Sequence, residues 1–125
     1  MFLFRRQRKP AMLDPDTLRA EQLNAGLALA MEWGENWLKP IQARLRLRYP
    51  QLSQAELDQF NSLCQEAMKF GHDTVYELAQ EAGTKTRVSD FESRFRTRYP
   101  WADARNVSHL YSQGMYYAWK DGAAL

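Results

Sequence analysis

Hydrophobic residues recur three and four positions apart along most of the chain, and no stretch alternates between hydrophobic and polar residues for long. This spacing places the hydrophobic side chains on one face of an α-helix. Three long runs follow the pattern, over residues 15–38, 53–82 and 103–121. The chain is therefore predicted to be all-α, with no strand.

The ends of these runs carry residues that favour helix termini. Pro15 stands at the first helical position, where its missing N–H costs nothing. Ser53 and Glu56 have the spacing of a capping box, and Gly83 follows the last hydrophobic position of the same run. Asp103 provides an N-cap for the last run. These residues support the boundaries that the periodicity indicates.

A seven-residue segment occurs twice in the chain. Residues 44–50 read Arg-Leu-Arg-Leu-Arg-Tyr-Pro, and residues 94–100 read Arg-Phe-Arg-Thr-Arg-Tyr-Pro, with five identities. A helix-capping residue and hydrophobic positions in the same phase follow each copy. This pattern predicts an internal duplication, with repeat units at about 40–83 and 89–125.

The repeat also predicts two short helices between the long ones. Pro40 aligns with Asp90, which follows Ser89, and Ser89 has the capping-box spacing with Glu92. We therefore expect Pro40 in the first turn of a new helix, where proline is tolerated. The predicted fold is a five-helix bundle in the order long-short-long-short-long, forming a single domain over residues 14–125, with helices near 15–38, 40–49, 53–82, 90–99 and 103–121.

Length and composition exclude several classes of protein. The chain has 125 residues, of which 45% are hydrophobic and 13% aromatic, so it is not an intrinsically disordered protein. Its one cysteine, Cys64, excludes an internal disulfide scaffold. No apolar run approaches the 18 or so residues that a transmembrane helix needs. We expect a soluble protein of a reducing compartment, the cytoplasm.

The positive charge is concentrated at the start of the chain. Residues 1–10 carry four basic residues and no acidic one, which leaves 13 basic against 15 acidic residues in the rest. Residues 1–13 are predicted to form a flexible basic tail, as chain termini often do. Membrane-surface binding through Phe2, Phe4 and the basic residues after them is the weakest of the functional hypotheses.

Arginines flank the hydrophobic stripe of both short helices, and they have two interpretations. Arg44, Arg48, Arg94 and Arg98 could bind phosphate and form a basic surface of the kind that nucleic-acid-binding proteins use. Cations in the last turn of a helix also interact favourably with its dipole, and their heads can pair with acids. We favour this structural role because the rest of the chain is slightly acidic, and nucleic-acid binding stays as the alternative function.

No catalytic or metal-binding constellation is evident in the sequence. Cys64 falls on the hydrophobic face of its helix, as an inert buried thiol does. The two histidines, His72 and His109, are far apart, and His72 with Asp73 and Glu77 offers too few ligands to predict a metal. We expect a protein that is not an enzyme and that has no cofactor.

The last helix has aromatic residues outside its core-facing stripe. Met115, Tyr116 and Trp119 lie on other faces of this helix, and Trp33 lies off the stripe of the first helix. A helix that is apolar almost all round is either buried or in contact with a partner. Tyr, Trp and Met are enriched in the cores of interfaces. The sequence therefore predicts a non-catalytic interaction protein that binds itself or another protein through these four residues.

Overall fold

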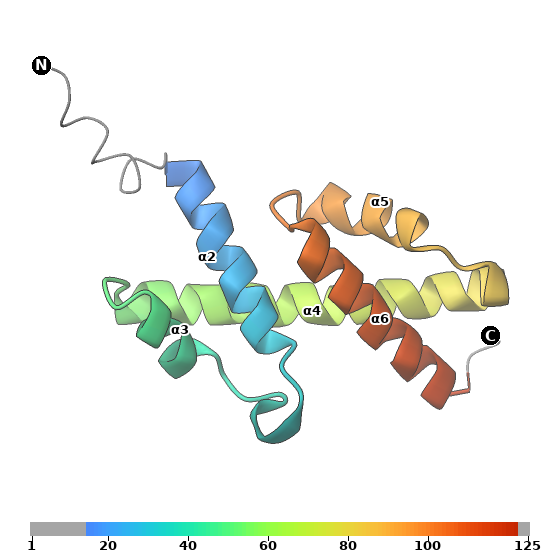
Figure 1. The fold of residues 1–125 in the computed structure, drawn as a ribbon, viewed down its shortest axis with the longest axis horizontal. Helices are drawn as coiled ribbons and strands as arrows, with labels where there is room; N and C mark the ends of the chain where they lie inside the picture. Colours follow the sequence, from blue (N-terminus) through green and yellow to red (C-terminus); the bar gives the residue numbers. More distant parts are fainter. Residues whose placement is uncertain (1–14, 123–125) are drawn as a thin grey trace, which may run out of the picture.

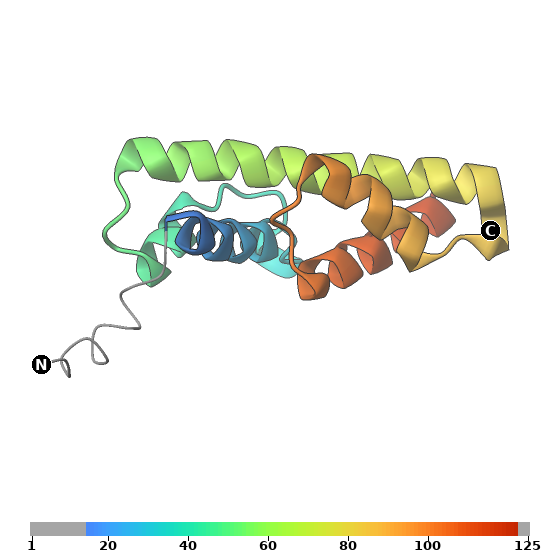
Figure 2. The ribbon, with the colours of Figure 1, turned by 90° about the horizontal axis from the view of Figure 1, so that it is seen from above.

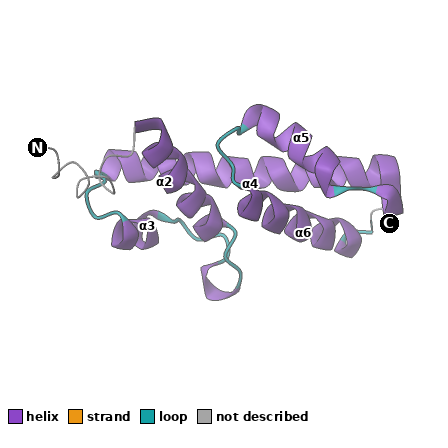
Figure 3. Cartoon of the chain, turned by 45° about the horizontal axis from the view of Figure 1, so that its top comes forward, coloured by secondary structure: helices purple, strands orange, loops and turns teal. Residues whose placement is uncertain are grey.

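Helix α4 is the long helix against which the other α-helices pack (Figure 1). The computed structural model describes residues 15–122, and these form five α-helices and two short 3-10 helices with no strand among them (Figure 3). The predicted all-α fold is confirmed for this part of the chain. The elements are α2 (Pro15–Ala30), η2 (Gly34–Asn36), α3 (Gln42–Arg48), α4 (Gln54–Ala82), η3 (Gly83–Lys85), α5 (Val88–Arg98) and α6 (Ala104–Lys120).

The remaining helices pack against one side of α4 (Figure 2). Helices α2 and α3 contact its first part, and α5 and α6 follow it in the chain and return along it (Figure 1). The largest fully buried side chains come from these inward faces and include Leu27, Ile41, Leu57, Phe91, Phe95 and Leu110. One hydrophobic core thus runs along α4 and joins all five helices.

The first helix is shorter than predicted. It ends at Ala30 instead of continuing to residue 38. Trp33 is extended, with ψ of 176°, and Gly34 has a φ of 89°, so the helical backbone cannot continue through this point. The hydrophobic residues beyond Ala30 match the helical period, but they belong to the α2–α3 connection. Periodicity alone placed them in the wrong element.

The short helices begin at different residues from those predicted. Pro40 precedes α3 and does not lie in its first turn, because Ile41 is the N-cap and donates its N–H to Asn61 Oδ1 of α4 at 3.0 Å. The capping box expected at Ser89 is also absent. Helix α5 starts at Val88 after Arg87, which provides no side-chain cap. A side chain of another helix, rather than a local cap, thus fixes the start of α3.

The predicted ends of the other two long helices, α4 and α6, are close to those observed. Ser53 Oγ accepts from the N–H of Glu56 at 3.1 Å, while Glu56 Oε1 accepts from the N–H of Ser53 at 2.8 Å, which completes the predicted capping box. Gly83 ends α4 with a φ of 57°. Asp103 caps α6 by accepting from the N–H of Asn106 at 2.8 Å.

Two close helix crossings hold the long helices together. At Gly26 of α2, an added Cβ would lie 2.8 Å from Cys64 Sγ of α4. At Gly114 of α6, it would lie 2.7 Å from Val75 Cβ, also of α4. The prediction of a buried Cys64 is confirmed, and burial raises the pKa of its thiol to about 12. The thiol is therefore protonated at neutral pH.

No helix among residues 15–122 has both the length and the apolar character needed to cross a membrane. The predicted basic tail, with Phe2 and Phe4, lies outside the described residues.

Candidate functional site

Five aromatic residues from the α2–α3 connection and the end of α6 form one cluster, which we call the aromatic surface. Its members are Trp33, Trp37, Tyr116, Tyr117 and Trp119. The ring centroids of Trp33 and Tyr116 lie 5.7 Å apart, and those of Tyr116 and Trp119 lie 6.2 Å apart. Trp33 is 49% exposed, Tyr116 44% and Trp119 65%. The structure thus brings together three of the four residues that the sequence proposed for partner binding.

The fourth predicted residue, Met115, does not belong to this surface. Its side chain is partly buried and packs against the hydrophobic core. The orientation of α6 explains the difference, because Met115 lies next to the core-facing Gly114 and Ala118 in the helical projection. Met115 therefore lies at the edge of the core, and its part in partner binding stays a prediction.

Two polar side chains, His72 and Gln113, lie beneath the inner part of the aromatic surface. The rings of Trp37 and Tyr117 are stacked, with centroids 6.1 Å apart, and His72 lies 5.4 Å from Tyr117. His72 Nε2 lies 3.2 Å from Oε1 of the buried Gln113, whose Nε2 donates to the carbonyl of Met31 at 2.6 Å. Burial lowers the pKa of His72 below its usual value, so the ring is neutral at pH 7.

Sequence reasoning missed Trp37 and Tyr117 as members of the surface. Both were placed on a core-facing helical stripe, and for Trp37 that helix does not exist at this point. Between Trp33, Gly34, Trp37, Tyr116, Tyr117 and Lys120 lies a shallow groove of about 270 Å³. The signal that could have placed Trp37 outside the first helix is Gly34. Glycine is unfavourable inside a helix, and Gly34 is the first residue of η2.

Leu38 continues the exposed hydrophobic surface in an unfavourable backbone conformation. Its φ is 67°, and it is the single non-glycine residue with a positive φ among residues 15–122. Its side chain is 66% exposed. A non-glycine residue in the left-handed region costs about 1–3 kcal/mol and is found most often at functional sites. Together with Trp37 and Tyr117, Leu38 lines a second small hollow of about 280 Å³.

Arg44 of α3 bonds both ends of the α2–α3 connection, which carries Trp33, Trp37 and Leu38. Its guanidinium donates to Glu32 Oε1 at 2.6 Å and to the carbonyl of Leu29 at 3.1 Å. It also donates to the carbonyls of Lys39 at 3.3 Å and Pro40 at 3.2 Å. The side chain of Arg44 is 20% exposed. One of the four predicted anion-binding arginines thus has all its direct partners within the protein.

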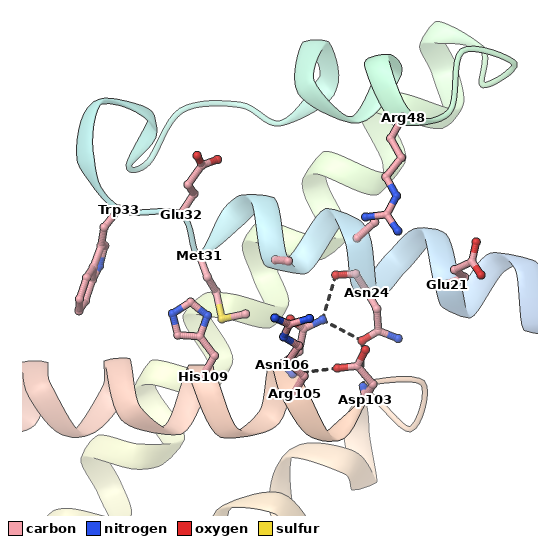
Figure 4. A pocket seen from close by; sticks show the side chains of 12 residues that line it. Glu21, Asn24, Met31, Glu32, Trp33, Arg48, Asp103, Arg105, Asn106 and His109 are labelled. Carbon is pink, nitrogen blue, oxygen red and sulfur yellow. Dashed lines mark hydrogen bonds between the residues drawn. The ribbon is translucent and has the colours of Figure 1, made fainter.

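A larger pocket of about 590 Å³ lies between α2 and α6, and we call it the α2–α6 pocket (Figure 4). Its floor is fixed by Asn24, which donates to the carbonyl of Trp101 at 2.8 Å and accepts from the N–H of Asp103 at 2.9 Å. Asn106 donates to Asn24 Oδ1 at 2.9 Å. The lining residues are Glu21, Asn24, Ala25, Ala28, Met31, Glu32, Trp33, Arg48, Asp103, Arg105, Asn106 and His109.

The acidic residues of the α2–α6 pocket each have a partner within the protein. Glu32 pairs with Arg44, Glu21 Oε1 accepts from the hydroxyl of Tyr49 at 3.2 Å, and Asp103 caps α6. The basic residues differ. Arg48 reaches into the pocket from α3 and Arg105 from α6 (Figure 4), and neither pairs with a carboxylate among residues 15–122.

The other two predicted anion-binding arginines are paired with acids. Arg94 bonds Glu81 at 3.1 Å, and Arg98 bonds Glu66 at 3.3 Å while lying 4.9 Å from the ring centroid of Phe70. Arg48 lies 5.6 Å from the ring centroid of Tyr49. Helices α3 and α5 do not contact each other and lie beside different parts of α4 (Figure 1). The structure does not join the two arginine clusters into one surface.

The described residues contain no group of three His, Cys, Asp or Glu side chains arranged to hold a metal ion. Asp73, which the sequence offered as a ligand beside His72, pairs with Lys69 at 3.1 Å instead. The side chains that line the aromatic groove, the hollow beside Leu38 and the α2–α6 pocket offer hydrogen bonds, charge pairs and aromatic contacts. Comparisons with known protein families, with curated proteins and with solved structures find no match to this chain.

Proposed function

We propose that the protein is a non-catalytic interaction module of the cytoplasm that binds a protein partner through the aromatic surface. One observation carries this proposal. Trp33, Tyr116 and Trp119 come from two distant parts of the chain, contact one another, and remain about half exposed or more. Trp and Tyr are the residues that contribute most to binding energy at protein interfaces.

The exposure of these side chains distinguishes the aromatic surface from a core. Single exposed hydrophobic residues are common on any protein, but contiguous groups mark sites of interaction. Leu38 extends the group and has a strained backbone conformation. Its side chain is exposed, so burial among the described residues does not offset this strain. This combination supports a surface that a partner covers.

The alternative of nucleic-acid binding through Arg44, Arg48, Arg94 and Arg98 has less support. Three of these four guanidinium groups pair with glutamates at 3.3 Å or less. A phosphate would have to displace those carboxylates, and the two clusters flank different parts of α4. We therefore do not carry this function further as a second proposal.

The internal duplication is also our proposal, and several matching contacts support it. Tyr49 and Tyr99 end their helices with nearly equal backbone angles, φ of −129° and −125° and ψ of 73° and 72°. Arg44 pairs with Glu32, and its repeat partner Arg94 pairs with Glu81. The proposed order of long and short helices follows from the same two units.

The duplication adds weight to the interaction proposal, because the aromatic surface lacks a counterpart in the first unit. In the repeat alignment Trp119 corresponds to Met68, which is 5% exposed, whereas Trp119 is 65% exposed. The buried position of Met68 in the first unit is thus an exposed position in the second, and the α6 part of the aromatic surface belongs to the second unit alone. A departure of this kind is expected where one copy has acquired a binding role.

Site-specific photo-crosslinking in the native host cell tests the proposal. A photoreactive amino acid at position 119 should form a discrete crosslinked band with a protein, which mass spectrometry then identifies. The matched control is the same amino acid at Leu47, which is 86% exposed on α3 and outside the aromatic surface. Crosslinks that are equal at both positions, or absent from both, would contradict the proposed function.

Analytical sedimentation of the purified protein tells whether the partner is a second copy of the chain or a different protein. A concentration-dependent dimer that is lost in Trp119→Ala identifies a second copy of the chain as the partner. Far-UV circular dichroism of Trp119→Ala and Tyr116→Ala should match that of the wild type. Loss of helicity in these variants would instead show that both residues belong to the core.

A further inference from the structure

We infer that the partner presents an acidic peptide segment that lies along α6, with a carboxylate between Arg48 and Arg105 and hydrophobic side chains on the aromatic surface. This inference rests on the proposed function and specifies the chemistry of the partner. It depends on three features of the α2–α6 pocket and the aromatic groove. These are the continuity of the two, the pairing of the charged side chains that line them, and the volume of each.

The α2–α6 pocket and the aromatic groove form one continuous surface. Trp33 lines both hollows, so no helix separates them. Along α6, the exposed residues that border this surface follow helical spacing, from the pocket at Arg105 and His109 to the groove at Tyr116 and Lys120. At 1.5 Å per residue this face is about 22 Å long. An extended peptide of about seven residues spans that length.

The charges of this surface favour a carboxylate. Helix α6 contains no Asp or Glu, while Arg105, His109 and Lys120 are all on it. In the pocket, the acids Glu21, Glu32 and Asp103 have hydrogen-bond or ion-pair partners in the protein. Arg48 and Arg105 have no carboxylate partner within residues 15–122, whereas four of the other five arginines of α3 and α5 each pair with a glutamate.

A guanidinium without a carboxylate partner is suited to one from outside. The planar fork of donors matches carboxylate geometry, and the resulting hydrogen bonds are stronger than neutral ones. Arg48 and Arg105 approach the pocket from opposite sides, α3 and α6 (Figure 4). An acidic side chain that enters between them would complete two charge pairs without displacing any existing one.

The dimensions suit side chains of a peptide. The α2–α6 pocket, at about 590 Å³, falls in the range of ligand pockets, and its apolar wall of Ala25, Ala28 and Met31 accepts the stem of a glutamate. The aromatic groove, at about 270 Å³, accepts one hydrophobic side chain. A polyanion such as nucleic acid fits less well, because the two guanidiniums can pair with one carboxylate, whereas a run of phosphates would also place charges beside Glu21, Glu32 and Asp103.

Selection from a random library of twelve-residue peptides displayed on phage, with the full chain as target, tests the inference. The selected sequences should combine Asp or Glu with Trp, Phe or Leu. A synthetic peptide of the consensus sequence, labelled with fluorescein, is then titrated against variants. Arg48→Gln/Arg105→Gln should bind it at least tenfold more weakly, and Trp33→Ala/Trp119→Ala should also bind it at least tenfold more weakly.

The matched control is Arg46→Gln/Arg87→Gln, which removes two arginines that do not line either hollow and should leave the affinity unchanged. A charge exchange guards against indirect effects on folding. The peptide with Lys in place of its acid should bind the wild type poorly and recover at least tenfold on Arg48→Glu/Arg105→Glu. Absence of this recovery would overturn the assignment of the carboxylate to these two arginines.

Three further outcomes are decisive. Selected peptides without acids that depend on Trp33 and Trp119 alone would overturn the inference and leave the proposed function intact. Peptides whose binding depends on neither pair would overturn both. If labelled dT12 bound with the same dependence on Arg48 and Arg105 as the peptide, the surface would belong to a nucleic acid and the inference would fail.

Discussion

Among residues 15–122, one aromatic cluster is closed inside the fold and another is open to solvent. Around α5, Phe91, Phe95 and Tyr99 are between 0% and 3% exposed and contact one another in sequence order. On the aromatic surface, Trp33 and Trp119 are 49% and 65% exposed. Both clusters have rings about 5–6 Å apart. Burial, and not residue type or ring contact, therefore separates a cluster that stabilises the fold from one that is free to bind.

The clusters also differ in the backbone that carries them. The α5 cluster comes from successive turns of one helix, which periodicity detects. The aromatic surface comes from a loop with two positive φ angles, at Gly34 and Leu38, and from a distant helix end. Comparison of the two clusters suggests measurements that should affect one and spare the other.

Phe95→Ala should have the largest effect. It removes a fully buried ring and leaves a cavity, so we expect the free energy of unfolding to fall by about 3–5 kcal/mol. Trp119→Ala should change it by about 0.5 kcal/mol or less, because most of that side chain is already in water. Urea unfolding followed by circular dichroism measures both. Similar losses in the two variants would remove the distinction between the clusters.

Gly114→Ala should have the next largest effect. The added methyl group would lie 2.7 Å from Val75 Cβ, which is next to the backbone of α4 and cannot rotate away. Overpacking of this kind costs about 1–3 kcal/mol. Gly26→Ala is the comparable variant at the α2–α4 crossing, and its added methyl group meets Cys64 Sγ at 2.8 Å. Thermal unfolding should show a smaller loss for Gly26→Ala, because a thiol can move more easily than a β-branched carbon; a larger loss would argue against this comparison.

Arg44→Ala should loosen the aromatic surface, whereas Arg94→Ala should do little. Arg44 makes four hydrogen bonds and its side chain is 20% exposed, so its removal should lower the free energy of unfolding by about 1.5–3 kcal/mol. Arg94 belongs to a surface ion pair, which typically contributes about 0–1 kcal/mol. Hydrogen exchange should rise at residues 31–41 in Arg44→Ala. Unchanged exchange there would show that the segment is held by other contacts.

The smallest effect concerns the pH dependence of the base of the aromatic surface. Burial lowers the pKa of His72, so the unfolded chain binds a proton more readily than the folded chain does. The stability that depends on neutral His72 is present above pH 6.5 and is lost as the pH falls below that value. His72→Gln should unfold with a weaker pH dependence between pH 7.5 and 5 in urea titrations. An equal dependence in both proteins would assign the titration to other groups.

Much of the fold could be predicted from local signals, and most of the candidate site could not. The capping residues Ser53 and Asp103 are effective because their partners lie three residues away in the sequence. The start of α3 depends instead on Asn61, which lies 20 residues further along the chain. No periodicity or local motif contains that information. The predicted end of the first helix failed for a different reason, because periodicity was followed past Gly34, where the helical backbone does not continue.

The prediction of the aromatic surface was partial because exposure is a property of the assembled fold. Trp33, Tyr116 and Trp119 were found as residues outside the expected stripes, and the structure places them together. Met115 precedes Tyr116 in the same helix, but its side chain packs against the core. No motif or periodicity singled out Arg105, which is notable because the acids that line the same pocket are already bonded. That contrast appears only when the ion pairs of the whole molecule are known.

The bonds of Arg44 have a consequence for the rate and cost of recognition. A connection of eleven residues between two helices would ordinarily sample many conformations, and each would have to be given up when a partner binds. Bonds to carbonyls at both ends of this connection, at Leu29 and at Pro40, restrict those conformations beforehand. Binding then loses less conformational entropy, and productive collisions need no rearrangement of the loop. An arginine that was first a candidate for holding phosphate would thereby set how quickly, and how tightly, a partner is recognised.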